Sequence, residues 1–138
     1  MRTKSLLFTF LTLALLYAHA AEKKVLEGNE TGDITLTQPT TVGNLTLQPG
    51  DYYIEDKESD GQHSIRFSLV KLTRRIQTSR AYTGWVTDRD LSKVGDVKCN
   101  AQPLDEKARN NTATLITGNG AQRLADVTLK GKKTLCVF

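Results

Sequence analysis

Few residues in this 138-residue chain could do acid–base or nucleophilic chemistry. Beyond residue 20 there is one histidine, His63, at the start of a predicted strand, and Asp60 is the carboxylate nearest to it in the sequence. A catalytic serine or cysteine needs such a histidine as its base. The sequence has no G-x-S-x-G turn to expose a serine nucleophile. We therefore predict no catalytic residues and a protein that is not an enzyme.

Ligand sets for metals and cofactors are also incomplete. One histidine and the two distant cysteines, Cys99 and Cys136, do not supply three or four ligands for a metal ion. Asp88, Asp90 and Asp96 are interrupted by basic residues where a calcium loop needs oxygen ligands, and they are more typical of a surface turn. No glycine-rich phosphate loop follows a strand. We predict no metal and no cofactor.

One segment combines basic and aromatic residues. Aromatic rings beside cations can stack on sugars or bases, and such a face would be a binding patch. Alternatively, Trp85 lies in the core and the charges form a solvated sheet edge that resists aggregation. We favour this second interpretation, because a small domain needs its few aromatic side chains for burial. The candidate binding face consists of Arg74, Arg75, Arg80, Tyr82, Trp85 and Arg89.

Residues 1–20 have the three parts of a secretory signal peptide. Arg2 and Lys4 precede an apolar run over residues 6–17, and Ala18 and Ala20 stand where signal peptidase requires small residues. The apolar run is too short to span a bilayer comfortably, which disfavours an uncleaved anchor. We predict cleavage after residue 20, a secreted or periplasmic location, and no membrane span in the mature chain.

The predicted mature chain is mildly basic and contains both cysteines. The whole chain has 19 basic and 15 acidic residues, and residues 1–20 hold two of the basic ones, so the remainder carries a net charge of +2. This excess is too small to indicate nucleic-acid binding. An oxidising compartment favours pairing of Cys99 with Cys136 over two buried free thiols. Such a disulfide stabilises a fold by about 4 kcal/mol in the chain-entropy model.

The rest of the chain alternates apolar and polar residues. Ile65, Phe67 and Leu69 share one face of the clearest half-buried strand. Glycine-containing turns separate the other strands, most clearly at Gly43-Asn44 and Asn119-Gly120. We predict an all-β domain over residues 34–138, either an antiparallel sandwich or a small barrel of about eight short strands.

Three local features are less regular. Residues 21–33 are polar and indicate a loose lead-in to the domain. Gly84 interrupts an aromatic and β-branched strand, which favours a bulge there. Residues 103–109 have acidic side chains near their start and predict a single helical turn.

Three segments carry a resemblance to a known group. They are LTQPTTVGNLTLQPGDYY over residues 36–53, HSIRF over residues 63–67 and GKKTLCVF over residues 131–138. With them the chain resembles small exported β proteins of acidobacterial type that have a TTVG…LxPGDY hairpin. The LxPGDY turn is also similar to that of carboxypeptidase-regulatory-like, prealbumin-type sandwich domains. The resemblance implies an exported bacterial β domain and supplies no activity. Residues 72–110 are longer and less alike, and the cysteine positions are not among those that carry the likeness.

Two function classes follow from these observations. We expect a structural or interaction module of the cell envelope, because the net charge is mild and the composition suits an ordinary core. The alternative is a ligand-binding or inhibitory domain that uses the basic and aromatic face against an acidic glycan or an acidic protein. The direction of Trp85, Tyr82 and Arg80, into the core or onto an exposed face, distinguishes the two classes.

Overall fold

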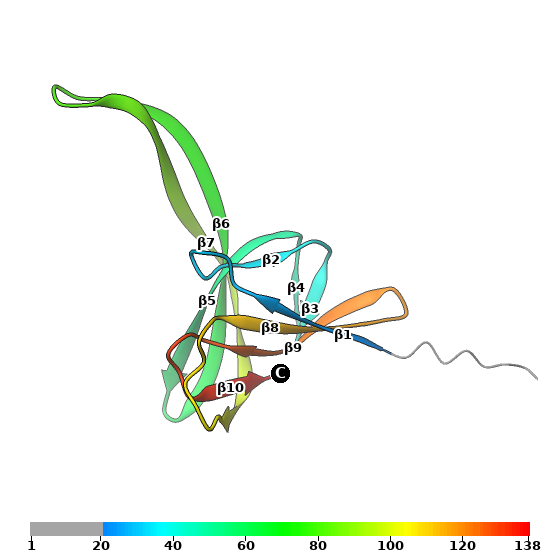
Figure 1. Ribbon diagram of the computed structural model, residues 1–138. Coiled ribbons are helices and arrows are strands. Elements are labelled where there is room, and N and C mark those ends of the chain that lie inside the picture. Colours follow the sequence, from blue (N-terminus) through cyan, green and yellow to red (C-terminus); the bar gives the residue numbers. More distant parts are fainter. Residues whose placement is uncertain (1–20) are drawn as a thin grey trace, which may run out of the picture.

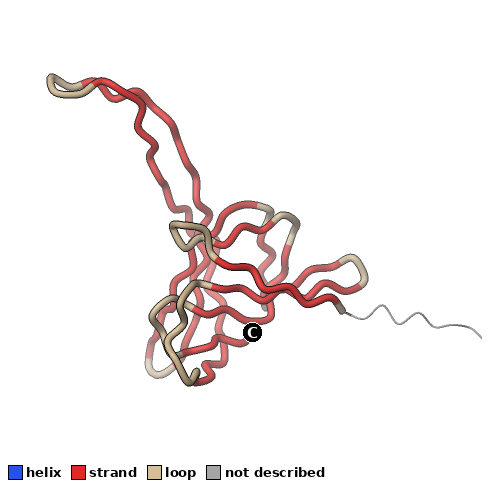
Figure 2. The backbone as a smooth tube through the Cα atoms, viewed as in Figure 1, coloured by secondary structure: helices blue, strands red, loops and turns tan. Residues whose placement is uncertain are grey.

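The computed structural model describes residues 21–138, so the signal-peptide prediction lies outside the described residues. The described chain folds into strands and turns with no helix (Figure 2), which confirms the all-β prediction, and no helix that could cross a membrane is found in this part. The ten strands are β1 (Glu22–Glu27), β2 (Ile34–Leu36), β3 (Thr40–Val42), β4 (Leu45–Leu47), β5 (Gly50–Ser59), β6 (Gln62–Thr78), β7 (Thr83–Pro103), β8 (Thr112–Gly118), β9 (Ala121–Thr128) and β10 (Thr134–Val137).

Eight of these strands form one nearly closed antiparallel barrel, with spatial order β1-β8-β9-β10-β7-β6-β5-β2 (Figure 1). The two end strands, β1 and β2, contact one another. The short hairpin β3–β4 joins the sheet through a parallel pairing of β3 with β9. Of the two predicted architectures, sandwich and barrel, the structure is the barrel.

The core fills the barrel because alternate residues of each strand point inward. In β6, Ile65 and Phe67 are almost fully buried, and Phe67 pairs with Ile54 of β5. The hydrophobic core consists of Ile34, Leu36, Val42, Leu47, Tyr52, Ile54, Ile65, Phe67, Val97, Cys99, Ala113, Leu115, Leu124, Val127 and Cys136. Among the described residues, these core side chains all lie within residues 34–136.

Three local predictions were wrong. The polar lead-in contains strand β1, which pairs with β8 through its backbone. Both faces of β1 are largely exposed, so its sequence shows no alternation of apolar and polar residues that would predict a strand. The helical turn over 103–109 is absent, because β7 continues to Pro103 and a loop follows. The bulge lies at Val94, which the pairing of β6 with β7 skips, and not at Gly84.

Strands β6 and β7 are far longer than the short strands predicted. β5 pairs with β6 only as far as Leu69. Beyond that point, residues 70–78 and 83–91 pair only with each other. We call residues 70–91 the arm. It spans nine residue pairs, about 30 Å of strand, and it extends well away from the barrel (Figure 1).

Candidate interaction surface

The two faces of the arm differ in composition. Residues directly opposite one another in a ladder share a face, and the faces alternate along each strand. Ile76 pairs with Trp85 on one face, and Arg75 pairs with Val86 on the other. The first face, which we call the apolar–basic strip, consists of Val70, Leu72, Arg74, Ile76, Thr78, Thr83, Trp85, Thr87, Arg89 and Leu91. The second, the polar face, consists of Lys71, Thr73, Arg75, Gln77, Gly84, Val86, Asp88 and Asp90.

The apolar–basic strip exposes large hydrophobic side chains to solvent. Trp85 is 55% exposed, Leu72 64% and Ile76 58%. Five of the seven exposed large hydrophobic side chains in residues 21–138 belong to the arm, and none of the core residues does. The expectation that Trp85 lies in the core is therefore wrong. Ile76 lies an odd number of residues after the inward-facing Phe67 on β6, so the strip continues the outer face of the barrel and not its core face.

The charge on the strip is entirely positive. Its two charged members are Arg74 and Arg89. The guanidinium carbon of Arg74 lies 4.7 Å from the centre of the Trp85 ring, a cation–π contact that holds the indole and the cation together on the exposed surface. The arm as a whole has five basic residues and two acidic ones, a net charge of +3. Because residues 21–138 carry only +2, the rest of the described chain is slightly negative.

Charges on the polar face are matched. Nε of Arg75 lies 2.5 Å from Oδ2 of Asp88, and Lys71 stands opposite Asp90 in the ladder. This face therefore has two cations and two anions and suits contact with water. The Asp88 and Asp90 side chains lie on a strand, which corrects their prediction as a surface turn.

The base of the arm is anchored to the barrel by Arg89. Its Nη2 donates to Oδ1 of Asp33, a carboxylate that is almost fully buried, and the Thr31 hydroxyl donates to the other oxygen of Asp33 over 2.7 Å. The Arg89 guanidinium also lies over the Tyr53 ring, 5.3 Å from its centre. A cavity of about 310 Å³ opens beside this contact, lined by Asn29, Glu30, Thr31, Asp33, Asp51, Val70, Leu72 and Arg89. These contacts of Arg89 hold the base of the arm in a fixed orientation relative to the barrel.

The tip of the arm is closed by a short turn that includes Arg80. Backbone and side-chain hydrogen bonds join Ser79 and Tyr82 across it. The Tyr82 ring packs on Gly84, where an added Cβ would lie 2.3 Å from the tyrosine oxygen. The lack of a side chain at Gly84 thus leaves room for the Tyr82 ring. This contact, and not a bulge, accounts for the glycine in the strand.

The structure divides the six residues of the candidate binding face. Arg74, Trp85 and Arg89 share the apolar–basic strip, with Arg89 held at its base. Arg75 lies on the polar face, and the tip contains Arg80 and Tyr82. Sequence reasoning missed the aliphatic members of the strip. Counting the hairpin register from the tip would have placed Ile76 opposite Trp85 and Leu72 farther along the same face.

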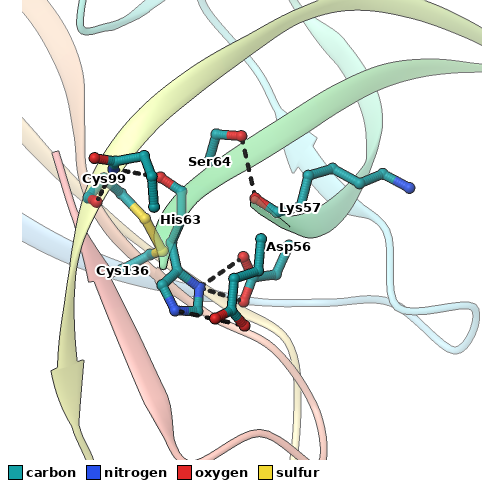
Figure 3. The surroundings of a disulfide bond; sticks show 8 residues. Asp56, Lys57, His63, Ser64, Cys99 and Cys136 are labelled. Atoms are coloured by element: carbon teal, nitrogen blue, oxygen red, sulfur yellow. Dashed lines mark hydrogen bonds and ion pairs between the residues drawn. A yellow bond between two sulfur atoms is a disulfide. The ribbon is translucent and has the colours of Figure 1, made fainter. Parts of the chain in front are cut away.

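His63 lies near the end of the barrel remote from the arm, beside the disulfide (Figure 3). Its Nδ1 is 2.9 and 3.0 Å from the two carboxylate oxygens of Asp56, so Asp56, and not Asp60, is its partner. The nearby Ser64 donates its hydroxyl to the Lys57 carbonyl, and Cys99 is in the disulfide. His63 and Asp56 thus form a hydrogen-bonded pair. The two nearby candidate nucleophiles, the Ser64 hydroxyl and the Cys99 sulfur, are bonded to other groups.

The disulfide joins Cys99 on β7 to Cys136 on β10, as the sequence predicts. Both half-cystines are buried in the core, and their Cα atoms are 5.3 Å apart. They are diagonal neighbours in the ladder, since Cys136 pairs with Ala101. The bond therefore ties the last strand to the body end of the strand that also forms the arm.

A charge cluster lies on the outer surface of the barrel near the bulge. Arg66 donates to Asp96 through Nε at 2.8 Å, and Nζ of Lys93 lies 3.1 Å from the same carboxylate. The Arg66 hydrogen bond, followed by that of Lys93, lowers the pKa of Asp96 from 3.8 to about 2. The cations thus keep this carboxylate ionised to a lower pH than an ordinary aspartate.

Comparison with protein-family models, with curated proteins and with solved structures finds no match to the chain. The functional argument therefore depends on the geometry of the arm and the barrel.

Proposed function

We propose that the protein is an interaction module that docks on a negatively charged partner through the apolar–basic strip of its arm. The observation that carries this proposal is the exposure of Trp85 beside Ile76 and Arg74, with the exposed Leu72 farther along the same face. An exposed apolar patch of this kind is typical of an interaction site. The sequence alone favoured a structural role, and the exposure of Trp85 supports the ligand-binding alternative.

The division of charge between the two faces supports an anionic partner. The charged side chains of the strip are both cations, and Arg74 contacts the Trp85 ring rather than an anion while Arg89 is paired with Asp33, whereas the polar face carries matched pairs. Complementary potential favours approach of the strip face to negative charge. Exported proteins meet such charge on acidic glycans, acidic proteins and anionic surfaces.

The direct test uses residues 21–138 and a variant with a shortened arm, in which Asn-Gly replaces residues 73–88. Asn-Gly suits a two-residue hairpin turn, and the variant keeps the Leu72–Arg89 pair and the contact of Arg89 with Asp33. It removes Arg74, Ile76 and Trp85. Binding to three immobilised polyanions is measured, namely polyglutamate, a sulfated polysaccharide and phosphatidylglycerol vesicles.

We expect the intact arm to bind at least one of these probes, and the shortened variant to lose that binding by roughly a hundredfold, because several anchoring side chains are removed together. Thermal unfolding of the variant provides the control for its fold. Equal binding by both proteins, or no binding to any polyanion, would contradict the proposal.

A further inference from the structure

The composition of the apolar–basic strip also distinguishes between anionic partners. We infer that the partner is the interface of an anionic lipid bilayer, on which the arm lies flat with the strip facing the lipid. This inference rests on the proposed function and identifies the partner of the same site.

The strip lacks the polar groups that a glycan site needs. Sugar sites combine a stacking ring with several converging hydrogen-bonding groups in a concave pocket. Around Trp85 the strip offers threonine hydroxyls and the Arg74 guanidinium, but also the aliphatic side chains of Leu72 and Ile76, which have no use in binding sugar hydroxyls. Among the described strands the outer arm is a two-stranded ribbon, and none of the other described strands forms a second wall beside Trp85.

The same side chains suit the boundary between lipid headgroups and acyl chains. Tryptophan is enriched at that depth, arginine reaches the phosphates, and aliphatic side chains enter the acyl region. An element with one apolar and cationic face and one polar face lies in the plane of an anionic membrane. Here the cation–π contact sets Arg74 over the Trp85 ring, so the indole and a phosphate-binding group arrive together.

The backbone of the arm restricts the depth of insertion. Residues 70–78 and 83–91 have one paired edge and one unpaired edge each, and unpaired amides are costly in the acyl core. The matched charges of Arg75 and Asp88 on the polar face also favour water. Both features favour an arm that lies at headgroup level rather than one that crosses the bilayer.

A second copy of the chain is a poorer occupant. Stacking two strips face to face brings the cations of one arm against those of the other. The remainder of the described chain carries a net charge of only −1, which gives little attraction for an arm of +3. Charge complementarity therefore favours a lipid surface of high negative charge density over self-association.

The test measures binding of residues 21–138 to equimolar phosphatidylglycerol–phosphatidylcholine vesicles, with pure phosphatidylcholine vesicles and polyglutamate as comparisons. Trp85 is the sole tryptophan, so its emission reports contact directly. We expect binding to the anionic vesicles with a blue shift of the emission, and quenching by lipids brominated high on the acyl chain.

Matched variants separate specific docking from general attraction. On the strip, Ile76→Ser is expected to weaken vesicle binding roughly tenfold or more, and Arg74→Gln about fivefold. On the polar face, Val86→Ser and Arg75→Gln are expected to change it by less than about twofold. All four positions lie in the arm, outside the core, so the folded body is retained.

Three outcomes overturn the lipid inference. Binding to polyglutamate or a sulfated polysaccharide, but not to anionic vesicles, contradicts a lipid partner and leaves the proposed function intact. Vesicle binding that falls equally with strip and polar-face variants shows attraction without docking. Absence of binding to every polyanion contradicts the inference and the proposed function together.

Discussion

The barrel and the arm are built from the same two strands, yet their alternating side chains meet different surroundings. In the body of β6, Phe67 points into the core and is almost fully buried. Ile76, nine residues later, lies on the opposite face of β6 and is 58% exposed. The strip to which Ile76 belongs continues the outer face of the barrel, and beyond Leu69 the only described strand that pairs with β6 is β7. A strand pattern shows which residues share a face, and the neighbouring strands decide whether that face becomes core or surface.

This contrast predicts that equal truncations in the two regions have unequal effects on stability. Phe67→Ala removes a buried ring from the barrel and is expected to lower the free energy of unfolding by about 3–5 kcal/mol. Trp85→Ala removes an exposed ring and is expected to cost less than about 1 kcal/mol. Urea unfolding of both variants checks the comparison. A loss at Trp85 as large as that at Phe67 would mean that the arm is part of the core.

The disulfide allows the barrel to be destabilised without changing any residue of the arm. Replacing both half-cystines by serine frees a loop with a sequence separation of 37 residues and is expected to destabilise the barrel by about 4 kcal/mol. The loop lies wholly outside the arm, so anionic binding by the fraction that remains folded is expected to stay unchanged. Denaturant unfolding gives the first quantity and vesicle binding the second. Loss of affinity per folded molecule would show that the barrel itself forms the docking surface.

The junction of the two regions is expected to give an intermediate effect. Arg89→Ala leaves the buried Asp33 carboxylate without its cationic partner, at a cost of about 1–3 kcal/mol. Adding Asp33→Asn removes the unpaired charge and should recover part of that loss. Arg74→Ala, an exposed arginine of the same strip, is the matched control and should cost less than about 0.5 kcal/mol. Equal effects at Arg74 and Arg89 would rule out the anchoring role of Arg89.

The smallest expected effect concerns acid stability of the barrel surface. Asp96 has a folded pKa of about 2, below its ordinary value of 3.8. Its ionised form therefore stabilises the fold at pH values above 3.8, and that contribution is lost as the pH falls toward 2. Because the cluster is exposed, the effect is small. The melting temperature of Asp96→Asn should be slightly below that of the native chain at pH 7 and equal to it near pH 2. A difference independent of pH would exclude this mechanism.

Much of the barrel could be predicted from the sequence, because its signals are local. The Asn119-Gly120 turn adopts the positive φ angles, 52° and 74°, that its residues favour, and the inward positions of Ile65 and Phe67 follow from alternation. The exposed strand β1 could not be predicted, because its side chains show no buried face.

Prediction from local sequence signals fails in the arm. Trp85 is a residue type that favours the core, but the register places it on the face that continues the outside of the barrel, and no other described strand covers it there. The contact of Arg89 with Asp33 joins positions 56 residues apart and has no local signal. The Asp56 partner of His63 could have been found, since it lies two positions from the residue that pairs with His63 in the hairpin.

The central claim is that the strip around Trp85 is open to solvent in the free protein and covered when an anionic partner binds. Iodide or acrylamide quenching of the sole tryptophan, with and without phosphatidylglycerol vesicles, measures both states. We predict red-shifted, readily quenched emission from the free protein, and a blue shift with protection from quenching on the vesicles. Blue-shifted, protected emission from the free protein would contradict the account, because it would place Trp85 in a core.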